Sequence, residues 1–572
     1  MTIATAAAGA LLLAGCGTNS PVAATNEVEL TEAGFALETP EPQRGGVVTV
    51  LGSVDLSHLD PAMGNDGNVN NVYNLIYRQL TQYVYDPASG ELDLVGDLAT
   101  DTGTPNEDAT EWTYTLRDDI FFEDGTPITS ADIAFGIERS LDPALAIGND
   151  EHLIIKGASE YAGIYEDPAG LPSIETPDDK TIVFTLEQPL AAFGDVAATQ
   201  IFTPFPEGEV SATQLDEMPI ASGPYRVESY ERGSHLTLVR NEHWVAETDQ
   251  IRPAYADGYE FLFGLDPSTI DQRMISAQGD DVNALASSTN GLLPANLAQV
   301  SADPRMTART VQSLPTCTMY LALNTTSPGL DELEVRQAIS YAIDRASVVT
   351  ATGGPAMAST ASDMLTPQVP GRYEFDLYPS EGDAGDVETA VAMLEEAGYG
   401  PGELSFTMDV RNLPKWQAQA ESVQQSLRAV GIDVDLNVID AATFYEVVAT
   451  PAQQHDMTVT GWCSAWLSGN PLLTPLFDGD AIAETGNTNI SQLDDEAINA
   501  RFDEISVMAD IDEQNAAYAE LNEQILELAP VVPLIRETPL QMVGSNVGGA
   551  YAHAGRTGYI DYASVGLINP EG

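Results

Sequence analysis

The fold class of this chain is decided by residues 404–438, LSFTMDVRNLPKWQAQAESVQQSLRAVGIDVDLNV. Leu404–Val410 predicts a strand, and Trp416–Val430 predicts a helix with Gly431 at its C-terminal boundary. Ile432–Val438 then alternates apolar and polar residues strictly, as a strand with one buried face does. Strand, helix and strand at this spacing predict a βαβ unit and therefore an α/β protein.

The sequence before this unit also predicts both helices and strands. Asp331–Val349 shows near-helical apolar spacing, and Val387–Ala397 predicts another helix. Closer to the N-terminus, Trp112–Arg117 alternates with period two, and Asp124-Gly125 supplies a hairpin turn. Ordered structure is predicted to begin with the short strand at Gly45–Leu51. The chain is therefore expected to be large, α/β and multi-lobed.

The composition excludes several kinds of partner. The 572 residues allow two or three domains, and 22 Lys and Arg oppose 87 Asp and Glu, a formal net charge of −65. Such a surface repels phosphates, so neither nucleic acid nor anionic lipid is expected as a partner. Because the acids are spread throughout the chain, we favour a solvated, soluble surface; attraction of cationic ligands is the alternative.

The position of Cys16 indicates where the protein resides. It ends the apolar run Leu11–Cys16 and precedes the polar residues Gly17–Ser20, as in a bacterial lipoprotein signal. We therefore expect a signal at 1–16 that ends at a lipidated Cys16 and anchors the protein to the outer face of the cell membrane. The alternative is a buried cysteine in an apolar helix. Residues 2–10 carry no Lys or Arg, which a start codon further upstream would explain.

The remaining N-terminal residues and cysteines support an extracytoplasmic protein. Residues 17–44 are rich in Ala, Thr, Glu and Pro and predict a flexible tether. Cys317 and Cys463 are then available to pair in an oxidising compartment. No segment approaches the roughly 20 apolar residues of a membrane span, so the chain is not a permease.

Four blocks of sequence occur in a fixed order: Trp112–Ile133 with Glu138-Arg139, Ser222–Val227 continuing to Trp244, Leu321–Asn324 with Val335–Arg345, and Ala529–Leu534. Together they resemble the family 5 extracellular solute-binding proteins, the receptors of oligopeptide and dipeptide ABC importers. The resemblance covers about residue 45 to the C-terminus, and the tail at 546–565 is similar to actinobacterial members. It implies a two-lobe periplasmic-binding-protein-like fold (type II) with an extra N-terminal subdomain and a hinge.

The resemblance also implies domain boundaries. Lobe one is expected at 45–90, 220–314 and 535–572, the inserted subdomain at 91–219, and lobe two at 315–534. The chain is expected to cross the hinge near 314–317 and 530–536, where prolines limit backbone freedom.

For function, the resemblance implies a monomeric, lipid-anchored receptor that binds a peptide-like solute between its lobes and delivers it to an ABC permease, without a cofactor. The alternatives are a sugar, nickel chelate or haem bound by the same fold, or an envelope enzyme or chaperone. The sequence contains no His-Glu-x-x-His, no Gly-x-Ser-x-Gly and no phosphate loop. We therefore expect a protein that is not an enzyme.

Two features of the family bear on the second half of the chain. Disulfide-bearing members place one cysteine at the start of lobe two and the other in a Gly-Trp-Cys motif, and Cys317 and Cys463 occupy both positions. The alternative is two free thiols.

Peptide receptors of this family often carry Asp two residues after the cysteine of the Gly-Trp-Cys motif, where it pairs with the peptide's α-ammonium. In this chain the residue at that position is Ala465. A buried ammonium without a carboxylate costs several kcal/mol. Either another acid holds the amine, or the ligand has no free amino terminus.

Further candidate ligand contacts come from three places. In the segment with Ala465, the candidates are Trp462, Ser464 and Trp466, with the two indoles as pocket walls or, alternatively, as core aromatics. In lobe one they are Asn65, Asp66 and Asn68, or else an ordinary surface loop. Arg411 and Asn412 follow a strand and are candidates to meet a ligand carboxylate. The Asp66, Asn68, Asn70 spacing lacks the Gly and closing Glu of a calcium loop, so no metal is expected.

Overall fold

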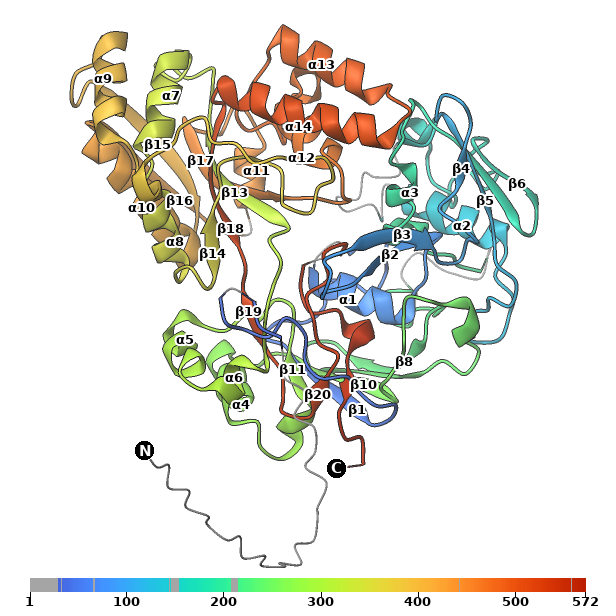
Figure 1. Cartoon of the computed structure of the whole chain (residues 1–572). Helices are drawn as coiled ribbons and strands as arrows, with labels where there is room; N and C mark the ends of the chain where they lie inside the picture. The colour runs from blue at the N-terminus through green and yellow to red at the C-terminus, as the bar shows by residue number, and fades with distance from the viewer. Residues whose placement is uncertain are drawn as a thin grey trace, which may run out of the picture.

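The computed structural model of the chain describes residues 29–31, 33–64, 67–142, 145, 154–206, 214–441, 443–556 and 558–571. The predicted site residues Cys16, Asn65 and Asp66 lie outside the described residues. The described part forms two lobes and a subdomain that is inserted in the first of them (Figure 1). Each of the three has its own sheet and its own apolar core, so the predicted α/β, two-lobe architecture is confirmed.

Lobe one is built on a mixed sheet with the strand order β11-β1-β10-β9-β8. β1 lies parallel to both β10 and β11, whereas β8, β9 and β10 are antiparallel. The strands are β1 (Val47–Leu51), β8 (Tyr225–Glu231), β9 (His235–Arg240), β10 (Gly258–Leu262) and β11 (Ala284–Ala286). The other elements are α1 (Gly67–Ile76), α4 (Pro267–Ser276), α5 (Pro294–Ser301), α6 (Pro304–Thr307), β20 (Val547–Gly548) and β21 (Gly566–Leu567).

The inserted subdomain has the antiparallel strand order β4-β5-β7-β6 and an aromatic core that includes Trp112 and Phe184. Its elements are β4 (Thr104–Pro105), β5 (Glu111–Thr115), α2 (Ser130–Ser140), β6 (Ile174–Asp178), β7 (Thr181–Thr185) and α3 (Phe193–Val196). A separate hairpin, β2 (Thr81–Tyr85) with β3 (Leu92–Gly96), links it to lobe one. Leu80 already belongs to the subdomain core, so a boundary at residue 90 divides this hairpin.

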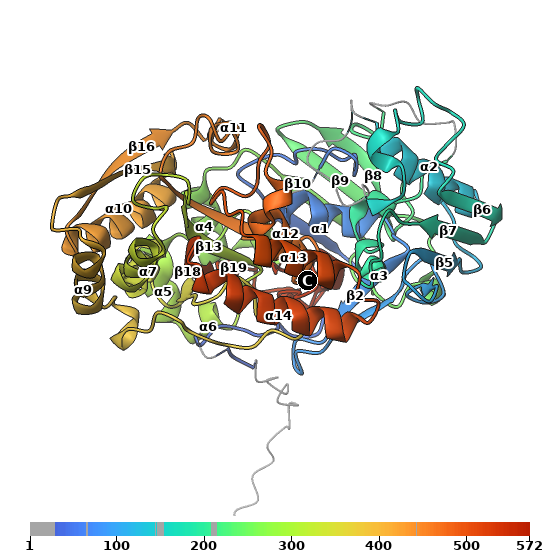
Figure 2. The same cartoon turned by 90° about the horizontal axis from the view of Figure 1, so that it is seen from above.

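Lobe two has the strand order β14-β18-β13-β17-β15-β16, with helices on both faces of the sheet (Figures 1 and 2). Along β13, Leu321 and Leu323 enter one core while Tyr320 and Ala322 enter the other, as the period of two requires. The strands are β13 (Cys317–Leu323), β14 (Ala358–Thr360), β15 (Leu404–Arg411), β16 (Ile432–Ile439), β17 (Met457–Cys463) and β18 (Val531–Glu537). The helices are α7 (Leu333–Ala342), α8 (Arg345–Thr352), α9 (Val387–Ala397), α10 (Pro414–Ala429), α11 (Phe444–Val448), α12 (Asn470–Phe477), α13 (Glu496–Ser506) and α14 (Ile511–Glu527).

Two predicted elements of lobe two have different outcomes. The βαβ unit is confirmed, because β15 and β16 pair in parallel on either side of α10. The single helix predicted over Asp331–Val349 is wrong: the structure has α7 and α8, with extended backbone at Ile343 between them. Asp344 accepts a hydrogen bond from the Ser347 amide and so caps α8, which favours a new helix start over continuation.

The hinge consists of two chain crossings that lie side by side. β12 (Thr310–Gln312) pairs antiparallel with β19 (Leu540–Met542) just below lobe two (Figure 1). The first crossing, residues 313–316, leads from β12 to β13, and the second, residues 538–539, leads from β18 to β19. The Ser313 amide donates to the Pro539 carbonyl at 2.9 Å. The second crossing therefore comes after the predicted 530–536, because β18 remains in the lobe-two sheet as far as Glu537.

The predicted flexible tether at 17–44 is wrong for its described second part. Phe35 and Ala36 are buried, and the Ala36 amide donates to the Thr310 carbonyl at 2.9 Å. Glu38 bridges to Tyr551, next to the C-terminal strands. The segment is ordered because the Phe35 side chain packs into the apolar cluster beneath α4 and β19. A tether prediction based on composition overlooks one well-placed aromatic residue.

A buried network of opposite charges joins lobe one to the β2–β3 hairpin. Asp97 follows β3 and binds two arginines, through Oδ1 to Arg78 Nε at 2.7 Å and through Oδ2 to Arg252 Nη2 at 2.8 Å. Arg252 also binds Asp249 at 3.1 Å. The four side chains are at most 2 % exposed. Such a network is specific in geometry and costly to break, because each partner left alone is a buried charge.

We expect the stability of the fold to depend on pH through His553. Burial, and then the charge of Arg556, lowers the pKa of His553 to about 3. The unfolded chain therefore takes up a proton below about pH 6.5 that the folded chain does not, and the free energy of unfolding falls as the pH falls. Between pH 7 and pH 5, urea unfolding should show that the wild type loses about 2 kcal/mol more stability than His553→Gln. The exposed-histidine variant His243→Gln should follow the wild type, and equal losses in all three proteins would contradict this account.

Candidate functional site

The carboxyl ends of three neighbouring strands meet at one edge of the lobe-two sheet. β15 lies parallel to both β16 and β17, and these strands end at Arg411, Ile439 and Cys463. In open α/β sheets, ligands bind in the crevice outside the carboxyl ends of the strands. This edge brings together two of the predicted groups, Arg411 with Asn412 and the segment that begins at Trp462.

Arg411 lies in a cage of aromatic rings. Its guanidinium carbon is 4.7 Å from the ring centre of Trp416, 4.8 Å from Phe444 and 4.5 Å from Tyr445. Trp416 is in the first turn of α10, and the other two rings come from α11. The three rings orient the cation by their electrostatic attraction and restrict the rotamers of a long side chain. Tyr445 is 52 % exposed and forms the outer wall of the cage.

The cage leaves part of the guanidinium without a partner. Nε and Nη2 of Arg411 are buried and have no hydrogen-bond partner in the described part of the chain. A buried N–H group without an acceptor costs about 1–3 kcal/mol, and more when it is charged. The adjacent donors Nε and Nη2 match the two oxygens of a carboxylate. The neighbouring candidate, Asn412, is exposed, and its Oδ1 accepts from Gln417 Nε2 at 2.8 Å.

The Gly461–Trp466 segment begins at a disulfide. Cys317 and Cys463 occupy directly opposed positions of β13 and β17, and a disulfide joins them. The bond spans 146 residues of sequence, for which loop-closure entropy predicts a stabilisation of about 4–5 kcal/mol. It fastens the first strand of lobe two to the strand that carries the candidate ligand segment.

The two candidate tryptophans have different surroundings. Trp462 packs against the second core of lobe two, and its Nε1 donates to the Pro471 carbonyl at 2.8 Å. Trp466 packs against the core of the inserted subdomain, across the boundary between the lobes. Between them, Ser464 Oγ donates to the Trp466 carbonyl, and Ala465 is exposed. Trp462 thus packs within lobe two itself, whereas Trp466 contacts the inserted subdomain on the other side of the boundary.

The lobe-one candidate that can be located is Asn68. It lies in the first turn of α1 and is 2 % exposed, so it is part of the packed helix and not of an open loop. Trp416, Phe444 and Tyr445 were not predicted to surround Arg411. Only the position of Trp416 five residues after Arg411 was a sequence signal, because Phe444 and Tyr445 are more than thirty residues away.

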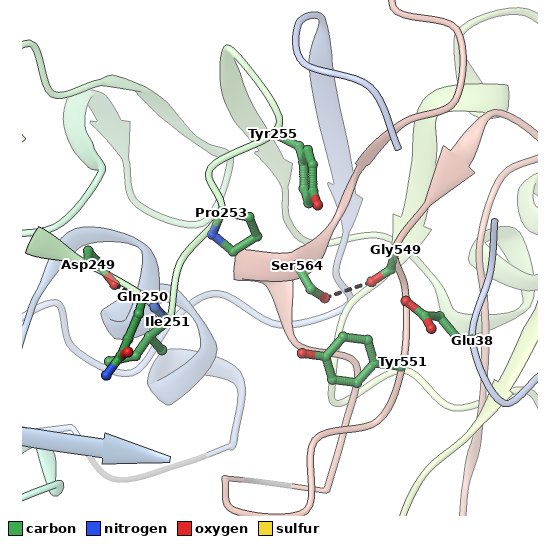
Figure 3. A pocket seen from close by; sticks show the side chains of 9 residues that line it. All are labelled: Glu38, Asp249, Gln250, Ile251, Pro253, Tyr255, Gly549, Tyr551 and Ser564. Carbon is green, nitrogen blue, oxygen red and sulfur yellow. Dashed lines mark hydrogen bonds between the residues drawn. The ribbon is translucent and has the colours of Figure 1, made fainter. Parts of the chain in front are cut away.

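A separate pocket of about 290 Å³ opens on lobe one (Figure 3). The residues that line it come from the N-terminal segment, the loop before β10 and the C-terminal region: Glu38, Asp249, Gln250, Ile251, Pro253, Tyr255, Gly549, Tyr551 and Ser564. Of the predicted site residues that the structure describes, none lines this pocket. Within the described ranges, no group of three or more His, Cys, Asp or Glu side chains is arranged to hold a metal ion.

The architecture by itself defines the fold class of the protein. Two α/β lobes joined by a pair of adjacent crossings, with an inserted subdomain, form the type II periplasmic binding-protein fold. A solved structure titled clavulanic acid biosynthesis oligopeptide binding protein 2 superposes with a TM-score of 0.87 at 30% identity, covering 94% of this chain and 98% of that one.

The family model for bacterial extracellular solute-binding proteins, family 5 (middle) matches residues 93–484. The chain therefore belongs to family 5 of the bacterial extracellular solute-binding proteins. It is 27% identical over 445 residues to the probable D,D-dipeptide-binding periplasmic protein DdpA of Escherichia coli (strain K12), covering 76% of this chain and 78% of the relative. It is also 24% identical over 507 residues to heme-binding protein A of Haemophilus influenzae (strain ATCC 51907 / DSM 11121 / KW20 / Rd), covering 83% and 85%.

The family consists of extracytoplasmic binding proteins, and these relatives are binding proteins and not enzymes. No helix in the described part of the chain has the length and apolar character needed to span a bilayer.

Proposed function

We propose that this protein is a receptor that binds a peptide-like, carboxylate-bearing solute between its two lobes and delivers it to an ABC importer. The observation that carries the proposal is Arg411, with two buried donors left unpaired at the carboxyl edge of the lobe-two sheet. A ligand carboxylate would satisfy both donors together. The names of the relatives agree with this ligand class, since one is a D,D-dipeptide-binding protein and another an oligopeptide-binding protein.

Capture would proceed by closure about the hinge. A ligand that contacts both lobes stabilises the closed form. The size of this effect is the difference between the ligand's binding free energies for the closed and the open form. The β12–β19 pair gives the two crossings a common axis, so both can bend together. The closed form is then the state that an importer recognises. We further propose that lipid on Cys16 holds the monomeric receptor at the outer face of the membrane.

Ala465 supports a second ligand class within the same fold. The exposed methyl group at this position cannot pair with the α-ammonium of a peptide. A solute without a free amino terminus, such as a sugar derivative, a metal chelate or haem, avoids this cost. The similarity to heme-binding protein A is consistent with this alternative.

We expect the substitution Ala465→Asp to create a preference for free amino termini. A carboxylate at position 465 can form a charge-assisted hydrogen bond to an α-ammonium, worth about 1.5–3 kcal/mol, or about 10- to 100-fold in affinity. Calorimetry with a tripeptide and its N-acetylated form should show this discrimination in the variant only. Ala465→Asn is the uncharged control and should show no gain. Strong discrimination by the wild type would mean that another acid already binds the amine.

The proposed function is tested by identifying the natural ligand. Mass spectrometry of small molecules released from the purified native protein, followed by calorimetry with the candidates, should yield a carboxylate-bearing peptide with a micromolar or lower Kd. Binding of a saccharide or a chelate, with no response to diverse peptides, would support the second ligand class. Turnover of a chromogenic ester or peptide would overturn the non-enzymatic assignment.

A further inference from the structure

The pocket on lobe one is built from three segments that lie far apart in the sequence (Figure 3). The N-terminal segment forms a backbone bridge to the C-terminal region at Glu38 and Tyr551. The third segment, residues 249–255, is joined to the N-terminal segment because the Gly45 amide donates to the Tyr255 carbonyl at 2.9 Å. All three segments belong to lobe one, so the cavity of about 290 Å³ does not depend on the position of lobe two.

The pocket has one carboxylate without a partner of opposite charge. Of the described residues that line it, two are acids and none is Lys, Arg or His. Asp249 is already neutralised, because its carboxylate binds Arg252 at 3.1 Å. Glu38 is exposed and forms no ion pair within the described ranges. Partial desolvation of its carboxylate, and then the charges of Asp86 and Glu41, raises the pKa of Glu38. The Glu38 carboxylate is thus left without a compensating cation in the described part of the chain.

The other polar groups of the pocket are mainly hydrogen-bond acceptors. Ser564 Oγ donates its single proton to the Gly549 carbonyl at 2.7 Å or to the Asp561 carbonyl at 2.8 Å, so only its lone pairs remain for a ligand. The hydroxyl groups of Tyr255 and Tyr551 point towards the same space and can also accept (Figure 3). The two aromatic rings add apolar surface that attracts a cation. The pocket therefore suits a ligand that donates hydrogen bonds and has an apolar body.

An organic ammonium ion matches these groups better than a neutral or anionic molecule does. A primary ammonium group has three N–H donors and no acceptor, and its charge is opposite to that of Glu38. An anion would meet Glu38 as a like charge, and a neutral polyol would leave the carboxylate uncompensated. The formal net charge of −65 adds a field over the whole surface that also favours a cation.

We propose that the lobe-one pocket is a second ligand site, which takes a small organic ammonium ion. The charged nitrogen is bound by the Glu38 carboxylate, and the carbon body packs against the rings of Tyr255 and Tyr551. Because Glu38 and Tyr551 come from opposite ends of the chain, a bound amine holds the N-terminal segment to the C-terminal region. The site is separate from the Arg411 edge of lobe two, so it does not depend on the proposed function.

The test is a titration of the full chain with cyclohexylammonium and with cyclohexanol, its neutral analogue of similar shape, followed by ligand-observed NMR. Cyclohexylammonium should bind at least about 10-fold more tightly, the usual gain from a hydrogen bond between charged groups. Glu38→Gln should remove this preference. The matched control is Glu41→Gln, which removes the same charge from an exposed residue that does not line the pocket. It should change the affinity by less than about twofold, because salt screens exposed charges.

Hydrogen exchange of the backbone amides, measured by mass spectrometry, locates the bound amine. Cyclohexylammonium at about ten times its Kd should slow exchange in a peptide covering residues 36–44 by up to about tenfold. It should leave a peptide covering residues 464–470, on lobe two, unchanged.

Three outcomes would overturn the proposal. They are equal binding of cyclohexylammonium and cyclohexanol, equal losses of affinity in Glu38→Gln and Glu41→Gln, and protection confined to residues 464–470. Tyr255→Ala removes one aromatic wall and should also weaken binding. Melting temperatures show whether this variant is folded, and if it is not, Glu38→Gln alone decides the matter. A titration with trialanine tests the proposed function separately, because the pocket can bind an amine in a receptor that rejects peptides.

Discussion

Replacing Arg411 with alanine should reduce the affinity for a carboxylate-bearing ligand by about 30-fold or more. Truncating one partner of a buried, hydrogen-bonded charge pair costs about 2–5 kcal/mol, because the other charge is left buried and unpaired. The ring cage holds the guanidinium in place, so under the proposed function the unpaired donors Nε and Nη2 would meet the ligand carboxylate in a fixed orientation. Calorimetry with the released natural ligand measures the effect.

Three further variants make the result specific to the guanidinium. Arg411→Lys keeps the charge but loses the two parallel donors, so its affinity should lie between those of the wild type and Arg411→Ala. Arg428→Ala, at an exposed position near the end of α10 in the same lobe, should leave binding unchanged. Tyr445→Ala opens the outer wall of the cage and should weaken binding less than Arg411→Ala. Undiminished affinity in a folded Arg411→Ala protein would remove Arg411 from the binding site.

The substitution Asp97→Ala should lower the free energy of unfolding by about 3–5 kcal/mol, the usual cost of breaking a buried ion pair. Asp97 binds Arg78 and Arg252 through its two oxygens, and it also accepts from the Gln79 amide at 3.2 Å. Without the Asp97 carboxylate, Arg78 and Arg252 stay buried with fewer hydrogen-bond acceptors and one opposite charge less. Urea unfolding, followed by the far-ultraviolet circular dichroism signal, measures the change.

The matched control is Asp93→Ala, because Asp93 is exposed on β3, the strand that Asp97 follows. Its effect should lie within about 0.5 kcal/mol of zero, as is usual for surface positions. Because the network joins the hairpin to lobe one, Asp97→Ala should also make the β2–β3 peptides exchange hydrogen faster than those of β15. A loss of stability below about 1 kcal/mol would show that the arginines find other partners.

Local patterns were sufficient where neighbouring residues determine the structure. The alternation in Ile432–Val438 and the helical spacing of Trp416–Val430 predicted β16 and α10, and the parallel pairing follows from their order. Local patterns failed where two local tendencies compete. At Asp344 the capping preference ended one helix and began another inside a continuous apolar pattern.

The site was predicted only in part, because its parts come together from distant segments. The position of Arg411 after a strand indicated a residue at a sheet edge, but not which rings surround it. Trp462 and Trp466 looked equivalent in sequence, and the structure gives one to the core of lobe two and the other to the inserted subdomain.

Short-range periodicity and motifs in a fixed order were enough to predict the α/β class, the family and the βαβ unit of lobe two. Long-range packing was needed to show that Phe35 orders the segment before β1, that Arg411 keeps two buried donors unpaired, and that Trp466 crosses to the subdomain. The two sets of features differ in the range of the interactions that produce them. Hydrogen bonds along a helix or strand repeat at fixed intervals, whereas burial and pairing across the lobes depend on which surfaces the completed fold brings together.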